Sequence, residues 1–294
     1  YKIIMQKLRQ YLSLIKFSHT IFALPFALIG YSLAIKDVDI FSNTSKFKLF
    51  FLVVLCMIFA RSAAMAFNRY IDRKIDAKNP RTASREIPAG IIPEQKALYF
   101  VIINCVLFIA TTFCINSICF YLSPIALFTI LFYSYTKRFT SLCHFVLGIG
   151  LSLAPIGAYL AVTGVFSLLP ILFSFTVFTW VAGFDIMYAL QDEEFDKSEK
   201  LFSIPSQMGI SNALKLSTVI HFITAVLIVS IGFYSNFHIS YWIGAAIFIG
   251  LLIYQHLIVK PNDLSRINLA FGTTNGIASL VFALFTILSI YYSK

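Results

Sequence analysis

The sequence predicts an all-α, polytopic integral membrane protein in which nine transmembrane helices form a single bundle. The chain of 294 residues is 59% hydrophobic, with a mean hydropathy of +0.83. Only 12% of its residues are charged, about half of the ~25% found in soluble domains. Nine segments are long and apolar enough, or nearly so, to cross a hydrocarbon core of about 30 Å. These observations exclude a soluble globular protein, a disordered chain and a nucleic-acid-binding module.

The nine expected spans follow a basic amphipathic segment at the start of the chain. They cover residues 17–35, 47–66, 97–115, 118–135, 144–163, 166–185, 213–233, 239–259 and 267–291. Because only Asn116 and Ser117 separate the third span from the fourth, these two spans are expected to form a tight hairpin. The first apolar stretch is long and is interrupted by Pro25, which argues against a cleavable signal peptide. We expect His19, at its start, to be an interfacial or packing histidine.

The basic residues predict the orientation of the bundle. With the N-terminus inside, 18 of the 23 lysines and arginines fall on the inner side, four fall outside and Arg61 lies within a span. Cytoplasmic loops of membrane proteins are enriched in Lys and Arg, so the N-terminus is expected in the cytoplasm and the C-terminus outside. Of the 13 acidic residues, 11 also fall on the inner side. The positive-inside rule does not explain these acids, so we expect this face to bind a ligand that carries charge.

Two acidic stripes begin at the inner ends of the second and sixth spans. The first consists of Asn68, Asp72 and Asp76, and the second of Asp185, Tyr188, Asp192 and Asp196. Intervals of three and four residues place the members of each stripe on one helix face. Asp72 and Asp192 are 120 residues apart, as are Asp76 and Asp196. This correspondence indicates a weak internal repeat, so residues 1–294 are expected to form one domain of two four-helix pseudo-repeats and a ninth helix.

Two such stripes facing each other would form a cage of carboxylate oxygens for divalent ions. Like charges on one helix face repel one another unless a cation lies there, and Mg²⁺ typically binds one or two carboxylates together with substrate phosphate oxygens. Cations of nearby loops would neutralise the remaining charge of a diphosphate; they are Arg81, Arg85, Lys137 and Arg138. The alternatives are a solvated face that exchanges ion pairs, and cations that only follow the positive-inside rule.

Two ionisable residues lie deeper in the membrane than this mouth. Arg61 precedes Asn68 by seven residues on the same helix face, which is about 10 Å, and Asp185 stands in the same relation to Asp192. Ionisable residues at such depth are candidates for function. Arg61 is therefore expected to bind the carboxylate of a small acid held beneath a diphosphate. The alternative is a structural ion pair between Arg61 and Asp185.

These residues resemble the motifs of the UbiA superfamily of intramembrane prenyltransferases, and the resemblance covers nearly the whole chain. Asn68-x3-Asp72-x3-Asp76 and Asp185-x2-Tyr188-x3-Asp192-x3-Asp196 are similar to its two signature aspartate motifs. Segments 15–26 (IKFSHTIFALPF) and 61–68 (RSAAMAFN) are similar to the 4-hydroxybenzoate polyprenyltransferase branch, including the futalosine-pathway menaquinone enzymes. Segment 200–206 (KLFSIPS) departs from the Lys-Ser-Thr-Ala pattern common in that branch.

The resemblance implies an Mg²⁺-dependent transfer of a polyprenyl group from polyprenyl diphosphate to the ring of a hydroxylated aromatic acid. The acceptor would be 4-hydroxybenzoate or a related quinone precursor such as 1,4-dihydroxy-6-naphthoate, in ubiquinone or menaquinone biosynthesis. It implies that Mg²⁺ is bound by Asn68, Asp72, Asp76, Asp192 and Asp196. The leaving diphosphate would be held by Lys137, Arg81 and Arg85, with Arg138 beside them. Tyr133 and Tyr188 would shelter the allylic cation, and Asp185 would polarise or deprotonate the phenol.

Other activities stay open at this point. Haem, chlorophyll and glycerophosphate prenyltransferases belong to the same superfamily. An ion-coupled transporter is less consistent with acids at one mouth, because carrier acids tend to lie near the midplane on broken helices. The expected partners are polyprenyl diphosphate, a small aromatic acid and the lipid bilayer, with no nucleic acid and no obligate protein partner. We expect a multi-pass protein of a bacterial inner membrane, with its active-site mouth on the cytoplasmic face.

Overall fold

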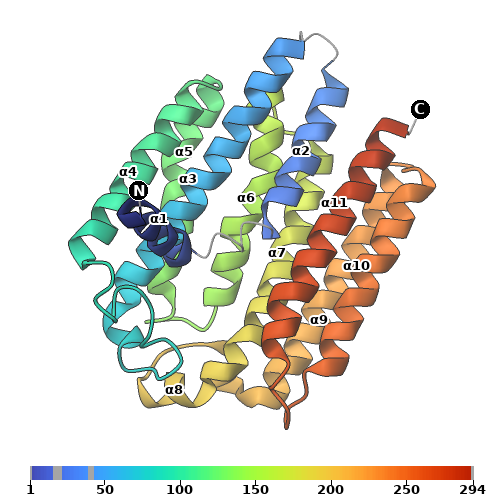
Figure 1. Ribbon diagram of the computed structural model, residues 1–294. Helices are drawn as coiled ribbons and strands as arrows, with labels where there is room; N and C mark the ends of the chain where they lie inside the picture. Colours follow the sequence, from blue (N-terminus) through green and yellow to red (C-terminus); the bar gives the residue numbers. More distant parts are fainter. Residues whose placement is uncertain (1, 16–21, 39–42, 293–294) are drawn as a thin grey trace.

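The computed structural model describes residues 2–15, 22–38 and 43–292, and these residues form a helical bundle without a β-strand (Figure 1). Eight of the helices are long and apolar enough to cross a membrane. The elements are α1 (Lys2–Leu14), α2 (Leu24–Asp37), α3 (Asn43–Asp76), α4 (Glu94–Phe113), α5 (Ser117–Thr136), α6 (Cys143–Thr163), α7 (Leu168–Ala189), the 3₁₀ turn η2 (Leu190–Asp192), α8 (Glu193–Ser198), α9 (Ile204–Tyr234), α10 (Ile239–Ile258), the π-helical turn η3 (Leu269–Thr274) and α11 (Asn275–Tyr292).

The all-α membrane fold is confirmed, with eight spanning helices in the described residues rather than nine. The eight correspond to the expected spans from 47–66 onward. The difference is at the first expected span, part of which, including His19, lies outside the described residues. Its described helix, α2, has 14 residues, which is about 21 Å long. Pro25 lies in the first turn of α2 rather than interrupting a helix, because a proline there removes an N–H that has no helical partner.

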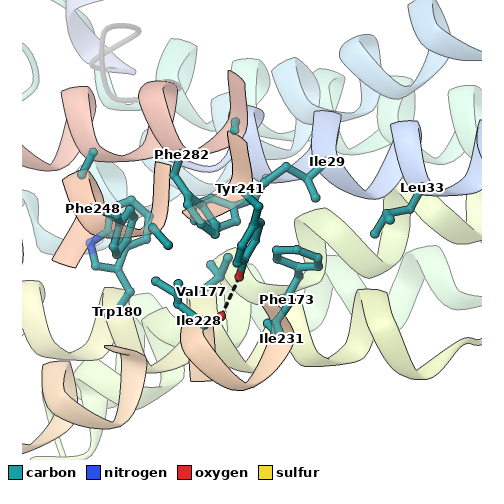
Figure 2. Close-up of a cluster of buried hydrophobic side chains, with 14 of the residues drawn as sticks. Ile29, Leu33, Phe173, Val177, Trp180, Ile228, Ile231, Tyr241, Phe248 and Phe282 are labelled. Atoms are coloured by element: carbon teal, nitrogen blue, oxygen red, sulfur yellow. Dashed lines mark hydrogen bonds between the residues drawn. The ribbon is translucent and has the colours of Figure 1, made fainter. Parts of the chain in front are cut away.

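An aromatic core joins α2, α7, α9, α10 and α11 in the C-terminal half of the bundle (Figure 2). Trp180, Tyr241, Phe248 and Phe282 are all fully buried there. The hydroxyl of Tyr241 donates a hydrogen bond to the carbonyl of Ile228 at 2.7 Å, which satisfies the one polar atom that this ring brings into the core. The packing holds α7, the helix that carries the start of the second acidic stripe.

Glycines allow α6 to approach its two neighbours closely. A Cβ atom at Gly30 would lie 2.0 Å from the carbonyl oxygen of Pro155, and one at Gly148 would lie 2.6 Å from that of Phe178. Small residues at such crossings let helix backbones pack closely in membrane proteins. The first turn of α6 is thereby held against the C-terminal half of α7, where Asp185 lies.

The charged connections gather at one end of the bundle. The segment between α3 and α4 and the short helix α8 lie together at the lower end in Figure 1, whereas α11 ends at the opposite end. The amine of Lys78 bonds the carboxylate of Glu199 at 2.6 Å and so links these two segments. This end is the inner face in the orientation that the basic residues predict.

Candidate active site

A cavity of about 880 Å³ runs through the bundle and brings the two acidic stripes together. Twelve of the thirteen site residues predicted from the sequence line it. They are Arg61, Asn68, Asp72, Asp76, Arg81, Arg85, Tyr133, Lys137, Arg138, Asp185, Tyr188 and Asp192. The lining then continues over apolar residues near the opposite end of the bundle, among them Ile115, Leu160 and Phe166. The cavity therefore joins a charged mouth to a long apolar interior.

Asp196 is the exception, because its side chain lies behind the cavity wall. It is completely buried, and its Oδ1 lies 2.7 Å from the amine of Lys137, which is itself part of the wall. Asp192 lines the cavity, whereas Asp196 does not in this arrangement of side chains, and its expected role as a metal ligand stays a prediction. Lys137 occupies the position between Asp196 and the cavity.

Each of the four aspartates expected to bind metal is paired with a different cation. The pairs are Asp72–Arg138 (2.9 Å), Asp76–Arg85 (2.7 Å), Asp192–Arg81 (2.5 Å) and Asp196–Lys137 (2.7 Å). Three of the carboxylates are buried, which differs from the solvated face considered as an alternative; they belong to Asp76, Asp192 and Asp196. A charge buried in this way needs a partner, since an uncompensated buried charge destabilises a fold strongly.

The four paired carboxylates do not form a cage by themselves in this arrangement. Among the described residues, no three His, Cys, Asp or Glu side chains converge closely enough to hold a metal ion. The donor set nonetheless suits a hard cation, because carboxylate and amide oxygens are the ligands that Mg²⁺ prefers. In addition, Oδ2 of Asp76 is buried without a hydrogen-bond partner. A buried acceptor without a partner is uncommon in native proteins and is suited to a bound cation.

The pairing of Arg81 with Asp192 joins the α3–α4 connection to the second stripe. Nε and Nη2 of Arg81 both donate to the Asp192 carboxylate, at 2.9 and 2.5 Å, and Asn79 Nδ2 donates a third hydrogen bond at 3.0 Å. Burial lowers the pKa of Arg81, but its hydrogen bond to Asp192 and the charge of that carboxylate outweigh burial and raise the pKa above its usual value. Asn79 was not predicted as a site residue; the Asn-Pro turn immediately before Arg81 was the available signal.

The first stripe is held by contacts within α3 and from the α5–α6 connection. Asn68 Nδ2 donates to Asp72 Oδ2 at 3.1 Å, so the amide and the carboxylate lie side by side as their spacing predicts. Arg138 Nη2 donates to Asp72 Oδ1 at 2.9 Å and to the carbonyl of Ile71 at 3.1 Å. The hydroxyl of Thr82 donates to the carbonyl of Asp76. The stripe is therefore fixed from two sides.

The segment after α8 braces the second stripe from behind. The backbone N–H of Phe202 donates to the carbonyl of Lys137 at 2.7 Å, and the hydroxyl of Ser203 donates to Asp196 Oδ2 at 2.8 Å. Ser203 also begins α9 through a reciprocal capping box with Ser206, an arrangement that satisfies two otherwise unpaired N–H groups. Burial lowers the pKa of Lys137, but the charge of Asp196 overcomes burial and raises it.

Two further arginines of α3 line the cavity: Arg61, which was predicted and lies deep, and Arg69, which the sequence analysis missed and which lies at the level of the first acidic stripe. The Nε atom of each is buried without a hydrogen-bond partner. Asp185 pairs instead with His144, Nδ1 to Oδ2, at 2.7 Å. The structural ion pair between Arg61 and Asp185 is thus not formed. Arg69 was detectable, because an interval of eight residues places it on the same helix face as Arg61.

Aromatic rings flank the mouth at Tyr188. The ring of Phe271 stacks on Tyr188 with centroids 4.0 Å apart, and the Arg81 guanidinium lies 5.6 Å from the Tyr188 centroid. Phe271 belongs to the π-helical turn η3, which is anchored where Trp180 Nε1 donates to Asn275 Oδ1 at 2.9 Å. Neither Phe271 nor His144 was predicted, because an isolated phenylalanine or histidine in an apolar span has no local signal for its partner.

Comparison with known proteins gives a family for most of the chain. Residues 23–289 match the UbiA prenyltransferase family. A 4-hydroxybenzoate octaprenyltransferase of Tolumonas auensis is 30% identical over 242 residues, covering 82% of this chain and 84% of that protein. A protein of the same name from Aliivibrio fischeri is also 30% identical, over 243 residues, covering 82% and 83%.

Solved structures show the same architecture. The apo structure of a UbiA homolog from Aeropyrum pernix K1 superposes with a TM-score of 0.77 at 28% identity, covering 93% of this chain and 97% of that one. A UbiA homolog from Archaeoglobus fulgidus, bound to DMAPP and Mg²⁺, shares the fold with a TM-score of 0.74 at 21% identity, covering 96% and 99%. The chain therefore belongs to the UbiA prenyltransferase family.

Proposed function

We propose that this prenyltransferase transfers a polyprenyl group from a polyprenyl diphosphate to the ring of a hydroxylated aromatic acid, with Mg²⁺ as cofactor. The acceptor is 4-hydroxybenzoate or a related quinone precursor such as 1,4-dihydroxy-6-naphthoate, in ubiquinone or menaquinone biosynthesis. The observation that carries the proposal is the convergence of two acidic stripes and four cations at the mouth of a cavity with an apolar interior. The names of the bacterial relatives support the aromatic acceptor.

The charge balance of the mouth supports a divalent cofactor. Each of the four carboxylates there is already paired with a cation, so a diphosphate that entered alone would compete with these carboxylates for their cations. Asn68, Asp72, Asp76 and Asp192 supply oxygen ligands on the wall, and Asp196 becomes accessible when Lys137 turns away. When bound, Mg²⁺ supplies Lewis-acid stabilisation of the charge that develops on the leaving diphosphate.

The four cations exchange partners when substrate binds. Arg81, Arg85, Lys137 and Arg138 release their carboxylates and donate to phosphate oxygens, which Arg can bind with two nitrogens at once. Movement of Arg81 also uncovers the ring of Tyr188. Tyr188 and Tyr133 can then shelter the allylic cation through their electron-rich faces.

The acceptor lies deeper than the diphosphate. The unpartnered, buried Nε of Arg61 is suited to a carboxylate, since hydrogen bonds between charged groups are the strong ones in a low-dielectric site. Asp185 accepts the proton of the phenol. Enclosure of the reacting atoms within the bundle keeps water from the allylic cation.

We also propose that the charged end of the bundle faces the cytoplasm of a bacterial inner membrane, as the distribution of Lys and Arg predicts. The chain is proposed to form one membrane-embedded domain whose two pseudo-repeats place the stripes of α3 and α7 at the same end. The lower end of Figure 1 is then the cytoplasmic end.

The experiment that tests the proposal incubates membranes containing the protein with a radiolabelled polyprenyl diphosphate and a panel of aromatic acids, with Mg²⁺ or with EDTA. We expect a labelled aromatic product that requires both an aromatic acid and Mg²⁺. Transfer only to a glycerophosphate, haem or chlorophyll precursor would assign another acceptor class of the same superfamily. Failure to consume the diphosphate would contradict the proposed chemistry.

A further inference from the structure

We infer that His144 is a positioning residue that holds Asp185 ready to take the proton of the acceptor phenol. The inference rests on the proposed function, because it requires a phenolic acceptor at Asp185. His144 lies in the first turn of α6, lines the cavity and has only 2% of its surface exposed. Its Nδ1 lies 2.7 Å from Oδ2 of Asp185, on the adjacent helix α7.

The second ring nitrogen of His144 fixes the tautomer. The backbone N–H of Ile204 donates to Nε2 at 3.3 Å, and a nitrogen that accepts a hydrogen bond bears no proton in a neutral imidazole. The proton of the neutral ring is therefore on Nδ1, which donates it to Asp185. Ile204 is the first residue of α9, and an N–H in the first turn of a helix has no partner within that helix. The ring is thus held at both nitrogens.

This arrangement leaves one carboxylate oxygen of Asp185 for the substrate. Oδ2 accepts from His144, and no described side chain donates to Oδ1. A carboxylate with one oxygen anchored has a defined direction for its second oxygen, and proton transfer requires a heavy-atom approach of about 2.6–3.2 Å. His144 itself is not the base, because one of its nitrogens is a donor to Asp185 and the other is occupied by Ile204.

In the proposed reaction, each proton has a defined donor and acceptor. The phenol transfers its proton to Asp185 Oδ1 while a ring carbon forms a bond to C1 of the prenyl group and the C1–O bond to diphosphate breaks. The resulting dienone loses the proton of that ring carbon to the released diphosphate. Asp185 returns its proton to the oxygen, which restores the phenol and the carboxylate.

The start of α9 links the carboxylate of Asp185 to the second acidic stripe. Ser203 donates to Asp196, and the next residue, Ile204, donates to His144. The start of α9 therefore positions a residue of the proposed metal set and, through His144, the proposed base. A displacement of this short segment would alter both at once.

The test compares His144→Leu with His144→Asn in membranes, using the best aromatic acid of the panel and its ring-fluorinated analogue, whose phenol is more acidic. His144→Leu is expected to lower kcat with the parent acid by roughly 10- to 100-fold, a loss typical of removing a supporting contact. The fluorinated acid should recover most of that loss, because a more acidic phenol needs less help to ionise. His144→Asn should retain more activity, since its side-chain amide can donate in place of Nδ1.

His221→Asn is the matched control. His221 is also buried and bonded, to the carbonyl of Trp180 at 3.2 Å and to His256 at 2.9 Å, but it does not line the cavity. Its replacement should lower thermal stability without altering kcat or the response to phenol acidity.

Several outcomes would overturn the positioning role. An equal loss with both acids in His144→Leu, or a loss of stability alone like that of the control, would make His144 purely structural. If the leucine variant fails to accumulate, the same comparison of acids in His144→Asn decides. Absence of transfer by wild-type membranes to any aromatic acid would instead refute the proposed function, and this role with it.

Discussion

Arg81 donates two hydrogen bonds to the carboxylate of Asp192, from Nε to Oδ1 at 2.9 Å and from Nη2 to Oδ2 at 2.5 Å. The two residues are 111 positions apart in the sequence. This bidentate pair closes the α3–α4 connection over the end of α7. A planar guanidinium matches a carboxylate or a phosphate equally well. The contact that holds Arg81 on Asp192 therefore also keeps this guanidinium at the mouth, where a diphosphate would need it.

Loss of either acidic stripe should abolish turnover. Asp72→Ala and Asp192→Ala each remove an oxygen ligand from the cavity wall, and each leaves a guanidinium without its partner. We expect less than a tenth of wild-type prenyl transfer in both variants, measured with radiolabelled diphosphate. Asp192→Asn, which keeps an acceptor for Arg81, should retain the fold and still lack activity. More than a tenth of activity in either alanine variant would argue against a shared metal site.

Removal of divalent cations should abolish activity without unfolding the protein. The four carboxylates already have cationic partners in the described structure, so EDTA should leave the thermal transition in detergent nearly unchanged. Inorganic diphosphate should raise the transition temperature in Mg²⁺ and much less in EDTA. Equal stabilisation by diphosphate in both conditions would show that the cations alone bind the anion.

Arg61 and Arg85 lie at different depths in the cavity, so their replacement should affect the binding of different substrates. Arg61→Leu is expected to raise the KM of the aromatic acid far more than that of the diphosphate, because an unpaired buried charge costs about 2–5 kcal/mol, or roughly 30-fold to several thousand-fold. Arg85→Leu, at the mouth, should instead weaken the binding of the diphosphate and raise its KM. Steady-state kinetics with each substrate varied in turn measures both effects. An equal rise in the KM of both substrates in Arg61→Leu would contradict the proposal that Arg61 binds the carboxylate of the aromatic acid.

The charged end should be accessible from the cytoplasm alone. Ala89 lies in the α3–α4 connection and His238 precedes α10, and both are exposed. In a background without native cysteines, Ala89→Cys should react with an impermeant maleimide only in inside-out vesicles, and His238→Cys only in intact cells. Labelling of Ala89→Cys in intact cells would reverse the predicted orientation.

Close packing of α6 on α7 should depend on Gly148. The Cβ of Gly148→Ala would lie 2.6 Å from the Phe178 carbonyl, and overpacking of this kind typically costs about 1–3 kcal/mol. Thermal unfolding in detergent should shift downward accordingly. Gly157→Ala is the control on the same helix, since its Cβ meets nothing within 4 Å; an equal shift in both variants would show that helix contact at Gly148 is not the cause.

The sequence alone determined the membrane bundle, its second to ninth spans, the two acidic stripes and twelve of the residues that line the cavity. These features depend on local patterns. Hydropathy over about 20 residues predicts a span, and intervals of three or four residues place side chains on one helix face. No knowledge of neighbouring helices is needed for either.

The tertiary structure alone decided which side chains become partners. Arg81 meets Asp192, His144 rather than Arg61 meets Asp185, and Lys137 separates Asp196 from the cavity. Such pairs depend on the rotation and closeness of helices far apart in the chain, which are set by contacts such as that of Gly148 with Phe178. Charge and spacing define candidates for pairing, but only the packing of α6 against α7 brings a histidine, and not an arginine, within 2.7 Å of that carboxylate.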